Sequence, residues 1–173
     1  MTLPSTIYRL RSTISRGFTL IELLIVISII GILTAIVTTN LVAARARARD
    51  ARRKGDLQAI HQSLRLYYAD NQHFPSGVNG VIRGCGASGN TNCPWDTAFS
   101  KNSTTIYMGH LPLDPSSSTT IISYKYISAG GDTFALVATL ENASDGDIAV
   151  SQARCSSVYT PTPTSTEYVV CAE

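Results

Sequence analysis

Uncharged residues fill one long stretch near the start of the chain. Between Leu23 and Ala44 there are 22 residues without a charge, most of them Leu, Ile, Val or Ala. At ~1.5 Å per residue, a helix of this length reaches roughly 33 Å, close to the thickness of the hydrocarbon core of a membrane. A helix also satisfies its own backbone polar groups in lipid. The pattern predicts a membrane-length helix over residues 18–44.

Two other interpretations of this stretch fit less well. A helix buried on all sides needs a deep protein core, which a chain of 173 residues seldom has. A cleaved secretory signal would also follow basic residues, but its apolar part is only about 7–15 residues long. We therefore expect the apolar helix to be retained in the mature protein.

The helical pattern continues beyond the apolar stretch. Residues 41–56 are rich in Ala and Arg, which have good helix propensity, and Gly55 is a mild cost within them. Four apolar residues then recur at spacings of three and four, which predicts one buried stripe: Leu57, Ile60, Leu64 and Tyr67. Pro75 prevents further continuation. We expect one helix from about residue 19 to 71, with residues 45–75 as the exposed continuation of the apolar part.

The next part of the chain, residues 76–150, predicts a small globular domain. Residues 76–103 are rich in Gly, Asn, Ser and Thr and are expected to form a loop. Alternating or apolar runs predict strands over 121–127 and 134–140, joined by a turn at 129–132. A third strand is expected near residues 147–150.

These elements predict an α+β fold in which the long helix packs on a small antiparallel sheet. The apolar stripe of the helix and the inward positions of the strands would then share one core. The core residues expected from the pattern are Leu57, Ile60, Leu64, Tyr67, Trp95, Leu111, Tyr126, Phe134, Leu136 and Val137.

The junction before the apolar stretch resembles a known signal. Residues 17–24 read Gly-Phe-Thr-Leu-Ile-Glu-Leu-Leu and resemble the class III signal of type IV pilins and type II secretion pseudopilins. The resemblance implies a leader of residues 1–17, cut by a prepilin peptidase between Gly17 and Phe18, with methylation of the new amine of Phe18. It also implies that Glu22 neutralises the amino terminus of a neighbouring subunit, which would otherwise be costly in lipid.

The same resemblance extends more loosely into the globular part. The motifs Leu111-Pro112-Leu113-Asp114-Pro115, Tyr124-Lys125-Tyr126 and Gly130-Gly131-Asp132 look like the domain of the major pseudopilins. One departure is the missing proline in the second half of the apolar stretch, where Thr38, Thr39 and Asn40 stand. If the helix melts locally in a filament, Gly31 is the expected place.

The four cysteines lie in a polar part of the sequence. An oxidising exterior suits them, and four cysteines allow three pairings. We favour Cys85–Cys93 and Cys155–Cys171, because each pair is local and lies in a region rich in loop-forming residues. The second bond would close the Thr/Pro/Ser-rich segment 151–173, like the C-terminal loop of many pilins. A zinc site is the alternative, but its usual ligand spacing is missing.

The resemblance to the major pseudopilins also implies calcium as a candidate ligand. Four carboxylates of the globular part could gather around such an ion: Asp132, Glu141, Asp145 and Asp147. We favour the simpler interpretation that residues 145–147 form a polar turn. No cofactor is otherwise indicated.

A cluster of basic residues follows the apolar stretch. Arg45, Arg49, Arg52 and Arg53 share one helical face. A solvated face and pairing with acidic groups of neighbouring subunits are equally good interpretations of it, and lipid headgroups are another partner. Nucleic acid is not expected as a partner, because the formal net charge is only +2 and aromatic residues do not alternate with the basic ones.

The resemblance implies the topology and partners of the chain. It implies a single-pass cytoplasmic membrane protein with its N-terminus inside, and then an extracellular or periplasmic filament. Counting charges gives the opposite orientation, because three arginines precede the apolar stretch and six basic residues follow it. The implied partners are copies of the chain and related pilins, the prepilin peptidase, the assembly platform and its ATPase, and the membrane.

The sequence therefore predicts a structural subunit and not an enzyme. The main interpretation is a subunit of a type IV pilus or pilus-like filament. The alternatives are a pseudopilin of a type II secretion system and a pilin-like subunit for DNA uptake. A membrane-anchored enzyme or solute-binding domain is not supported, because the sequence has no catalytic triad, metal-ligand cluster or phosphate-binding loop. A cell-surface receptor module, with the helix only as its anchor, is a third interpretation.

Overall fold

The fold is described from a computed structural model of the chain. The structure describes residues 17–116, 124–128, 130–160, 162 and 165–172, without the side chains of residues 36–40. The chain divides into two compact units, Met1–Leu41 and Val42–Glu173. The second unit contains all the strands.

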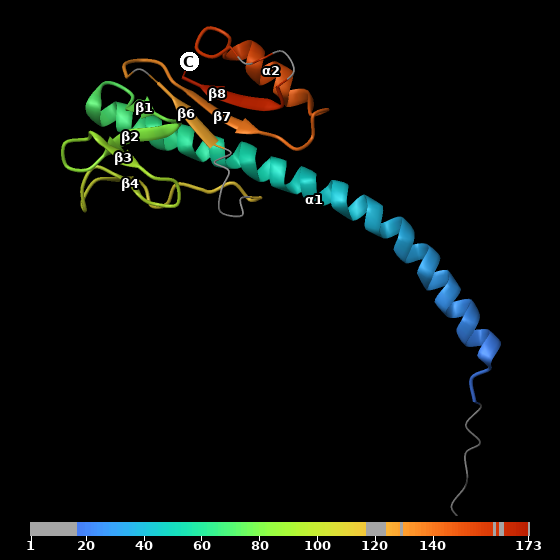
Figure 1. Cartoon of the computed structure of the whole chain (residues 1–173). Coiled ribbons are helices and arrows are strands. Elements are labelled where there is room, and N and C mark those ends of the chain that lie inside the picture. The colour runs from blue at the N-terminus through green and yellow to red at the C-terminus, as the bar shows by residue number, and fades with distance from the viewer. Residues whose placement is uncertain (1–16, 117–123, 129, 161, 163–164, 173) are drawn as a thin grey trace, which may run out of the picture. The chain divides into compact units, whose positions relative to one another are not determined.

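Helix α1 runs from Leu20 to Asn71 and confirms the expected single long helix (Figure 1). Asn71 ends it because Gln72 takes a left-handed conformation with φ of 60°, and the Gln72 N–H donates to the Tyr68 carbonyl at 2.8 Å. The helix is continuous through Gly31 and Gly55. Within the described residues, no helix combines the length and apolar character that a membrane crossing requires.

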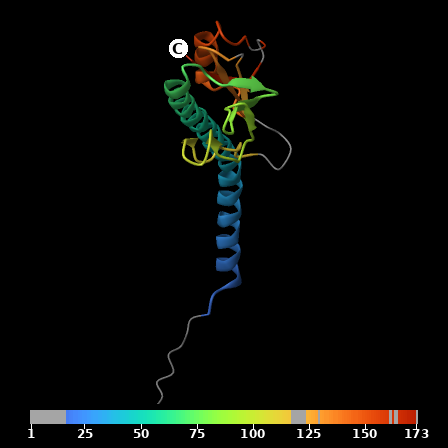
Figure 2. The ribbon, with the colours of Figure 1, turned by 90° about the vertical axis from the view of Figure 1, so that its left-hand side faces the viewer.

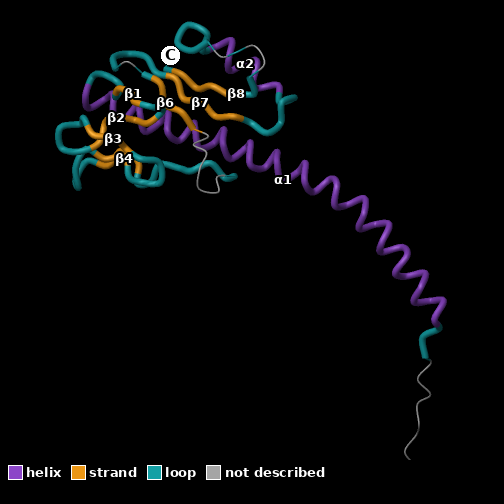
Figure 3. Tube along the Cα trace, viewed as in Figure 1, coloured by secondary structure: helices purple, strands orange, loops and turns teal. Residues whose placement is uncertain are grey.

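A three-stranded antiparallel sheet forms the centre of the second unit. Its order is β6 (Tyr124–Ile127), β7 (Ala135–Thr139) and β8 (Glu167–Cys171), and Leu136 of β7 is paired with Tyr126 and Val170. Helix α1 covers one face of this sheet, and helix α2 (Gly146–Arg154) lies on the other (Figures 1 and 3).

Strand β7 is buried on both faces because it is the central strand between two helices. Leu136 and Ala138 join the core that contains the α1 stripe. Ala135 and Val137 point to the opposite face, where they pack with Cys155 at the end of α2. This double burial explains why the sequence of β7 is almost continuously apolar.

Two features of the globular part were predicted wrongly. The third strand expected near residues 147–150 is instead part of helix α2, whose first turn is capped by the Asp145 side chain accepting from the Asp147 N–H. The third strand is β8, which comes from the segment 151–173 that was expected to be a loop. The signal was Tyr168-Val169-Val170, a short β-favouring run beside a disulfide-forming cysteine.

The segment 76–103 was also expected to be a loop and contains short strands. One sheet has the order β1 (Ser76–Val78), β2 (Val81–Cys85) and β3 (Thr91–Cys93), and a separate pair joins β4 (Phe99–Ser100) to β5 (Ile106–Met108) (Figure 2). A tight turn at Asn79 and Gly80, both with positive φ, joins β1 to β2. The strands are too short for an alternating pattern to stand out.

The expected strands and turn are otherwise found where the structure describes them. Strand β6 begins at Tyr124, the first residue after a gap, so the earlier part of the expected strand 121–127 lies outside the described residues. Residue 129 of the expected turn also lies outside them. Gly130 and Gly131 both have positive φ, as a tight turn requires.

The predicted core is confirmed at nine of its ten positions. Leu57, Ile60, Leu64 and Tyr67 of α1 are each at most 2 % exposed. The exception is Trp95, which is partly buried and packs edge-on against Tyr124 with ring centroids 5.9 Å apart. The other buried members of the predicted set are Leu111, Tyr126, Phe134, Leu136 and Val137.

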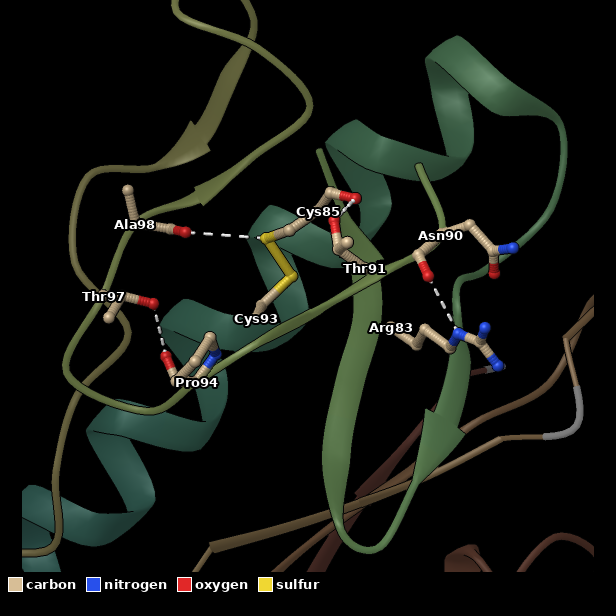
Figure 4. The surroundings of a disulfide bond; sticks show 8 residues. All are labelled: Arg83, Cys85, Asn90, Thr91, Cys93, Pro94, Thr97 and Ala98. Carbon is tan, nitrogen blue, oxygen red and sulfur yellow. Dashed lines mark hydrogen bonds between the residues drawn. A yellow bond between two sulfur atoms is a disulfide. The ribbon is translucent and has the colours of Figure 1, made fainter. Parts of the chain in front are cut away.

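Two disulfides close the structure locally. Cys85–Cys93 joins β2 to β3, and the Cys85 sulfur lies 3.6 Å from the Ala98 carbonyl oxygen (Figure 4). Cys155–Cys171 joins the end of α2 to β8 across 16 residues of sequence. Each bond therefore links two elements covalently. The second bond fixes the end of α2 on its face of the sheet.

Candidate functional site

The predicted processing segment lies open at the start of α1. Gly17 and Phe18 precede the helix, and Phe18 is 78 % exposed. A Cβ built on Gly17 would meet no atom within 4 Å. A peptidase could therefore reach the Gly17 carbonyl without displacing any part of the chain that the structure describes.

Thr19 and Glu22 form a reciprocal cap at the first turn of α1. The Glu22 N–H donates to the Thr19 hydroxyl oxygen at 3.2 Å. In return, Glu22 Oε2 accepts from the Thr19 N–H at 3.2 Å and from the Thr19 hydroxyl at 2.9 Å. This is the capping box, in which the N-cap and the third helical residue satisfy each other's free backbone donors.

Glu22 therefore has a structural role within the subunit besides the role expected in assembly. From the sequence, Glu22 was expected only to contact a neighbouring subunit in the assembly. The spacing Thr-x-x-Glu before an apolar run would have predicted the cap. The carboxylate is exposed, and among the described residues it accepts only from Thr19, so capping leaves acceptor capacity for a second donor.

The apolar side chains on either side of Glu22, at the start of α1, are largely exposed. Their exposed fractions run from 81 % at Leu20 to 45 % at Val26. Such a surface is far larger than a soluble monomer normally presents, so it marks a region that lipid or other protein chains cover. The residues concerned are Leu20, Ile21, Leu23, Leu24, Ile25, Val26, Ile27, Ile29, Ile30, Ile32 and Leu33.

A second constellation lies where α1 meets the globular domain, and its centre is a buried arginine. Arg53 is 2 % exposed and makes a two-pronged contact with Asp114, from Nε at 2.6 Å and from Nη2 at 3.0 Å. Its Nη1 donates to Asp50 Oδ1 at 2.5 Å, and its Nη2 donates to the Ser116 hydroxyl at 2.8 Å. The guanidinium therefore holds the 111–116 segment against the helix.

Asp50 and Glu141 extend this cluster to the loop after β7. The buried Asp50 carboxylate accepts from the backbone N–H groups of Glu141 and Asn142, each at 2.9 Å. The Glu141 carboxylate accepts from Arg49 Nε at 2.7 Å and Nη2 at 2.5 Å, and its Oε1 lies 2.9 Å from Arg53 Nη2. We call Arg49, Asp50, Arg53, Asp114 and Glu141 the buried ion cluster.

Lys54 makes a parallel contact with the start of α2. Its Nζ donates to both carboxylate oxygens of Asp145 and to Asp147 Oδ2, each at 2.7 Å. Asp145 is the N-cap of α2, so the same carboxylate caps one helix and pairs with the other. Arg53 and Lys54, which are consecutive in α1, thus hold three segments of the domain in place: residues 111–116, the loop after β7 and the start of α2.

The electrostatics of the buried ion cluster favour its charged form. Burial pushes the pKa of the Asp114 carboxyl upward, but hydrogen bonds from Arg53 and Ser116 outweigh it and hold that pKa well below its usual range. Hydrogen bonds from Arg49 lower the pKa of Glu141 to about 2. The pKa of Arg53 is raised, chiefly by its hydrogen bonds to Asp114.

These contacts correct the interpretation of the basic residues after the apolar stretch. They were expected to be a solvated face or to pair with neighbouring subunits, but Arg49 and Arg53 pair with carboxylates of the same chain. The missed signal is the spacing of Arg53 from Leu57, Ile60 and Leu64, which places it on the buried face. A buried arginine needs carboxylate partners, and the sequence places Asp50 one turn before Arg53.

The four carboxylates considered for calcium do not come together in the structure. Asp132 accepts from the Tyr68 hydroxyl at 2.9 Å, and Glu141 belongs to the buried ion cluster. Asp145 and Asp147 share Lys54. Nowhere in the described part of the chain do three His, Cys, Asp or Glu side chains gather in a way that could hold a metal ion.

Comparisons with known proteins agree with the exposed N-terminal segment. The family profile for the prokaryotic N-terminal methylation motif matches residues 13–38, which include Gly17, Phe18 and Glu22. No solved structure matches the chain at a significant level.

Curated relatives extend the likeness into the globular domain. The type II secretion system core protein G of Escherichia coli is 32 % identical over 124 residues, 68 % of this chain and 82 % of that protein. The protein of the same name from Pseudomonas aeruginosa is 32 % identical over 117 residues, 66 % of this chain and 74 % of that protein. The type IV wide pilus major component PilA4 of Thermus thermophilus is 44 % identical over 68 residues, 39 % of this chain and 52 % of that protein.

The chain thus combines an N-terminal methylation motif with a long helix, whose first part is apolar and exposed and whose second part packs on a small sheet. It is also similar over much of its length to pseudopilins and pilins. The proteins of this family are structural and not enzymes. The chain belongs to the family of type IV pilins and type II secretion pseudopilins.

Proposed function

We propose that this chain is a pseudopilin, the structural subunit of a filament of the type II secretion kind. The extent of similarity carries this proposal. The likeness to protein G spans 124 residues, which is longer than the 52 residues of α1 and therefore includes part of the globular domain. The likeness to PilA4 spans 68 residues. The type IV pilus that the sequence analysis put first is thus supported less well than its alternative.

The proposed path begins with a precursor anchored in the cytoplasmic membrane by residues 18–44. A prepilin peptidase removes residues 1–17 and methylates Phe18. The exposed apolar side chains of α1 then leave lipid and pack against those of other copies, with little hydrophobic cost. Pairing of the Glu22 carboxylate with the Phe18 amine of a neighbouring subunit sets the register.

The remaining parts of the chain have roles that follow from this path. Residues 45–75 carry the domain on the second half of the helix, and residues 76–150 form its loops and sheet. Strand β8 completes the sheet, and the Cys155–Cys171 bond ties it to the end of α2. The assembly platform and its ATPase would extract the processed subunit from the membrane into the periplasmic filament.

The test compares two substitutions of Glu22 in the host. Glu22→Ala removes both the cap and the charge, whereas Glu22→Gln keeps an oxygen acceptor for Thr19 and removes only the charge. We expect both variants to be processed and to remain in the membrane but to form no filaments. Normal filaments from Glu22→Gln would show that the cap matters and that charge pairing does not.

A second measurement separates secretion from motility and adhesion. Deletion of the gene is expected to abolish export of secreted enzymes and to leave surface pili in place. Mass spectrometry of the subunit should find N-methylated Phe18 as its first residue. Loss of surface pili with secretion intact would instead support the type IV pilus.

A further inference from the structure

The basic residues after the apolar stretch divide into two groups by their partners. Between residues 49 and 54, every basic residue has a carboxylate of the same chain within 4 Å: Arg49, Arg52, Arg53 and Lys54. Arg52 has the loosest contact, with its Nε 3.9 Å from Asp56 Oδ2. Arg45 and Arg47, which lie nearest the apolar stretch, have exposed side chains and no acidic partner among the described residues.

The position of these two arginines along the helix is defined by the sequence before them. Arg45 follows Ala44 directly, and Ala44 is the last of the 22 uncharged residues. When a helix of roughly 33 Å of uncharged sequence crosses a hydrocarbon core of about 30 Å, the next residue lies at the headgroup level. Arg45 and Arg47 therefore occupy the far edge of the segment that the proposed anchor places in lipid.

The positions of Arg45 and Arg47 around the helix axis suit contact with a layer of lipid headgroups better than contact with one protein surface. Residues two apart are separated by about 200° around an α-helix and by only about 3 Å along it. Arg45 and Arg47 thus project to nearly opposite sides at the same level. One docked protein surface could meet one of them, whereas a lipid headgroup layer surrounds the helix and meets both.

The chemistry of the side chains specifies which headgroups fit. A guanidinium is always charged and presents paired donors that match the oxygens of a phosphate. Anionic lipids attract basic side chains that lie near a membrane surface. We propose that Arg45 and Arg47 bind the phosphates of anionic phospholipids at the outer face of the membrane. This inference rests on the membrane anchor in the proposed function and not on filament formation.

The test measures lipid retention by the full chain. The wild-type chain and an Arg45→Gln/Arg47→Gln variant are purified in detergent with phosphatidylglycerol and phosphatidylethanolamine, and native mass spectrometry counts the lipids that remain bound. We expect the double variant to keep at least threefold less phosphatidylglycerol, with phosphatidylethanolamine unchanged. Arg52→Gln is the matched control, because it removes a nearby charge whose Asp56 partner is in the same chain.

Three results would overturn the inference. Equal retention of phosphatidylglycerol by the wild type and the double variant would do so, as would an equal loss from Arg52→Gln. Loss of filaments by the double variant with lipid retention intact would assign the two arginines to a contact between subunits. Extraction with alkaline carbonate tests the membrane anchor separately. Release of the wild-type chain from membranes would contradict the anchor itself.

Discussion

The two halves of α1 place apolar and charged side chains in opposite environments. From Leu23 to Leu33 the helix carries no charge, and its large apolar side chains are exposed to solvent in the isolated subunit. From Arg49 to Arg53 the helix is highly charged, yet Asp50 and Arg53 are each only 2 % exposed. One continuous helix thus exposes apolar side chains in its first half and buries two charged side chains in its second half.

The difference shows which half of the helix finds its contact partners within its own chain. The buried charges are stable because Asp114, Glu141 and two backbone N–H groups of the same chain satisfy them. The apolar half has no such partner in the described residues, and the proposed function gives it lipid and other copies of the chain as partners. Variants in the charged half should therefore change the folding of the domain, and variants in the apolar half should not.

The largest expected effect comes from the centre of the buried ion cluster. Arg53→Met leaves the buried carboxylates of Asp50 and Asp114 without their cation. Removing one partner of a buried ion pair costs about 3–5 kcal/mol, so we expect the free energy of unfolding to fall by that amount. Urea unfolding of the detergent-solubilised chain, followed by fluorescence of its single tryptophan Trp95, measures the change. Arg52→Met is the control, and a loss below about 1 kcal/mol from Arg53→Met would contradict the role of the cluster.

A pair of identical substitutions compares the two halves directly. Leu64 is fully buried in the core, whereas Leu24 is 53 % exposed. We expect Leu64→Ala to lower the free energy of unfolding of the domain by about 2–5 kcal/mol, because it leaves a cavity. Leu24→Ala should leave that free energy unchanged within about 0.5 kcal/mol in the same urea titration. Similar losses from both would mean that the apolar half contributes to the folded domain.

The smallest effect concerns acid stability. The pKa of Glu141 is lowered to about 2 in the folded chain, against about 4.3 in an unfolded one. Its ion pairs therefore stabilise the folded state above about pH 4.3, and this contribution is lost as the pH falls toward 2. Because Glu141 is one-third exposed, we expect a contribution of only about 0.5–1 kcal/mol.

The measurement for this effect is the melting temperature of wild type and Glu141→Gln between pH 6 and pH 2.5. The two curves should differ most at pH 6 and converge toward pH 2.5. The wild type will still lose stability in acid, since the lowered pKa of Asp114 acts in the same direction. Curves that stay parallel over the whole range would show that Glu141 contributes nothing.

The parts that sequence predicted are those in which one periodic pattern extends over many residues. The helix over 19–71 and the stripe at Leu57, Ile60 and Leu64 follow from spacing alone, since helix faces repeat every 3.6 residues. The processing segment at Gly17 and Phe18 was indicated by resemblance, not by a physical pattern. The local cap of Glu22 was missed although its spacing was visible.

The parts that sequence did not predict depend on contacts between distant residues. Arg53 meets Asp114 across 61 positions, and no local pattern indicates that pairing. Strand β8 is short and flanked by Pro and Thr, so it becomes a strand only because β7 offers a free edge and Cys171 bonds to Cys155. Helix α2 took the place of an expected strand because four residues are too few to distinguish the two periods.

The place of β8 in the sheet has a consequence for biosynthesis. The central strand β7 has β6 on one side and β8 on the other, and β8 ends at Cys171. While the chain folds, one edge of β7 therefore stays unpaired until residues 167–171 reach it. An unpaired edge can recruit a strand from another molecule, and the Cys155–Cys171 bond, which ties β8 to the end of α2, keeps that edge covered.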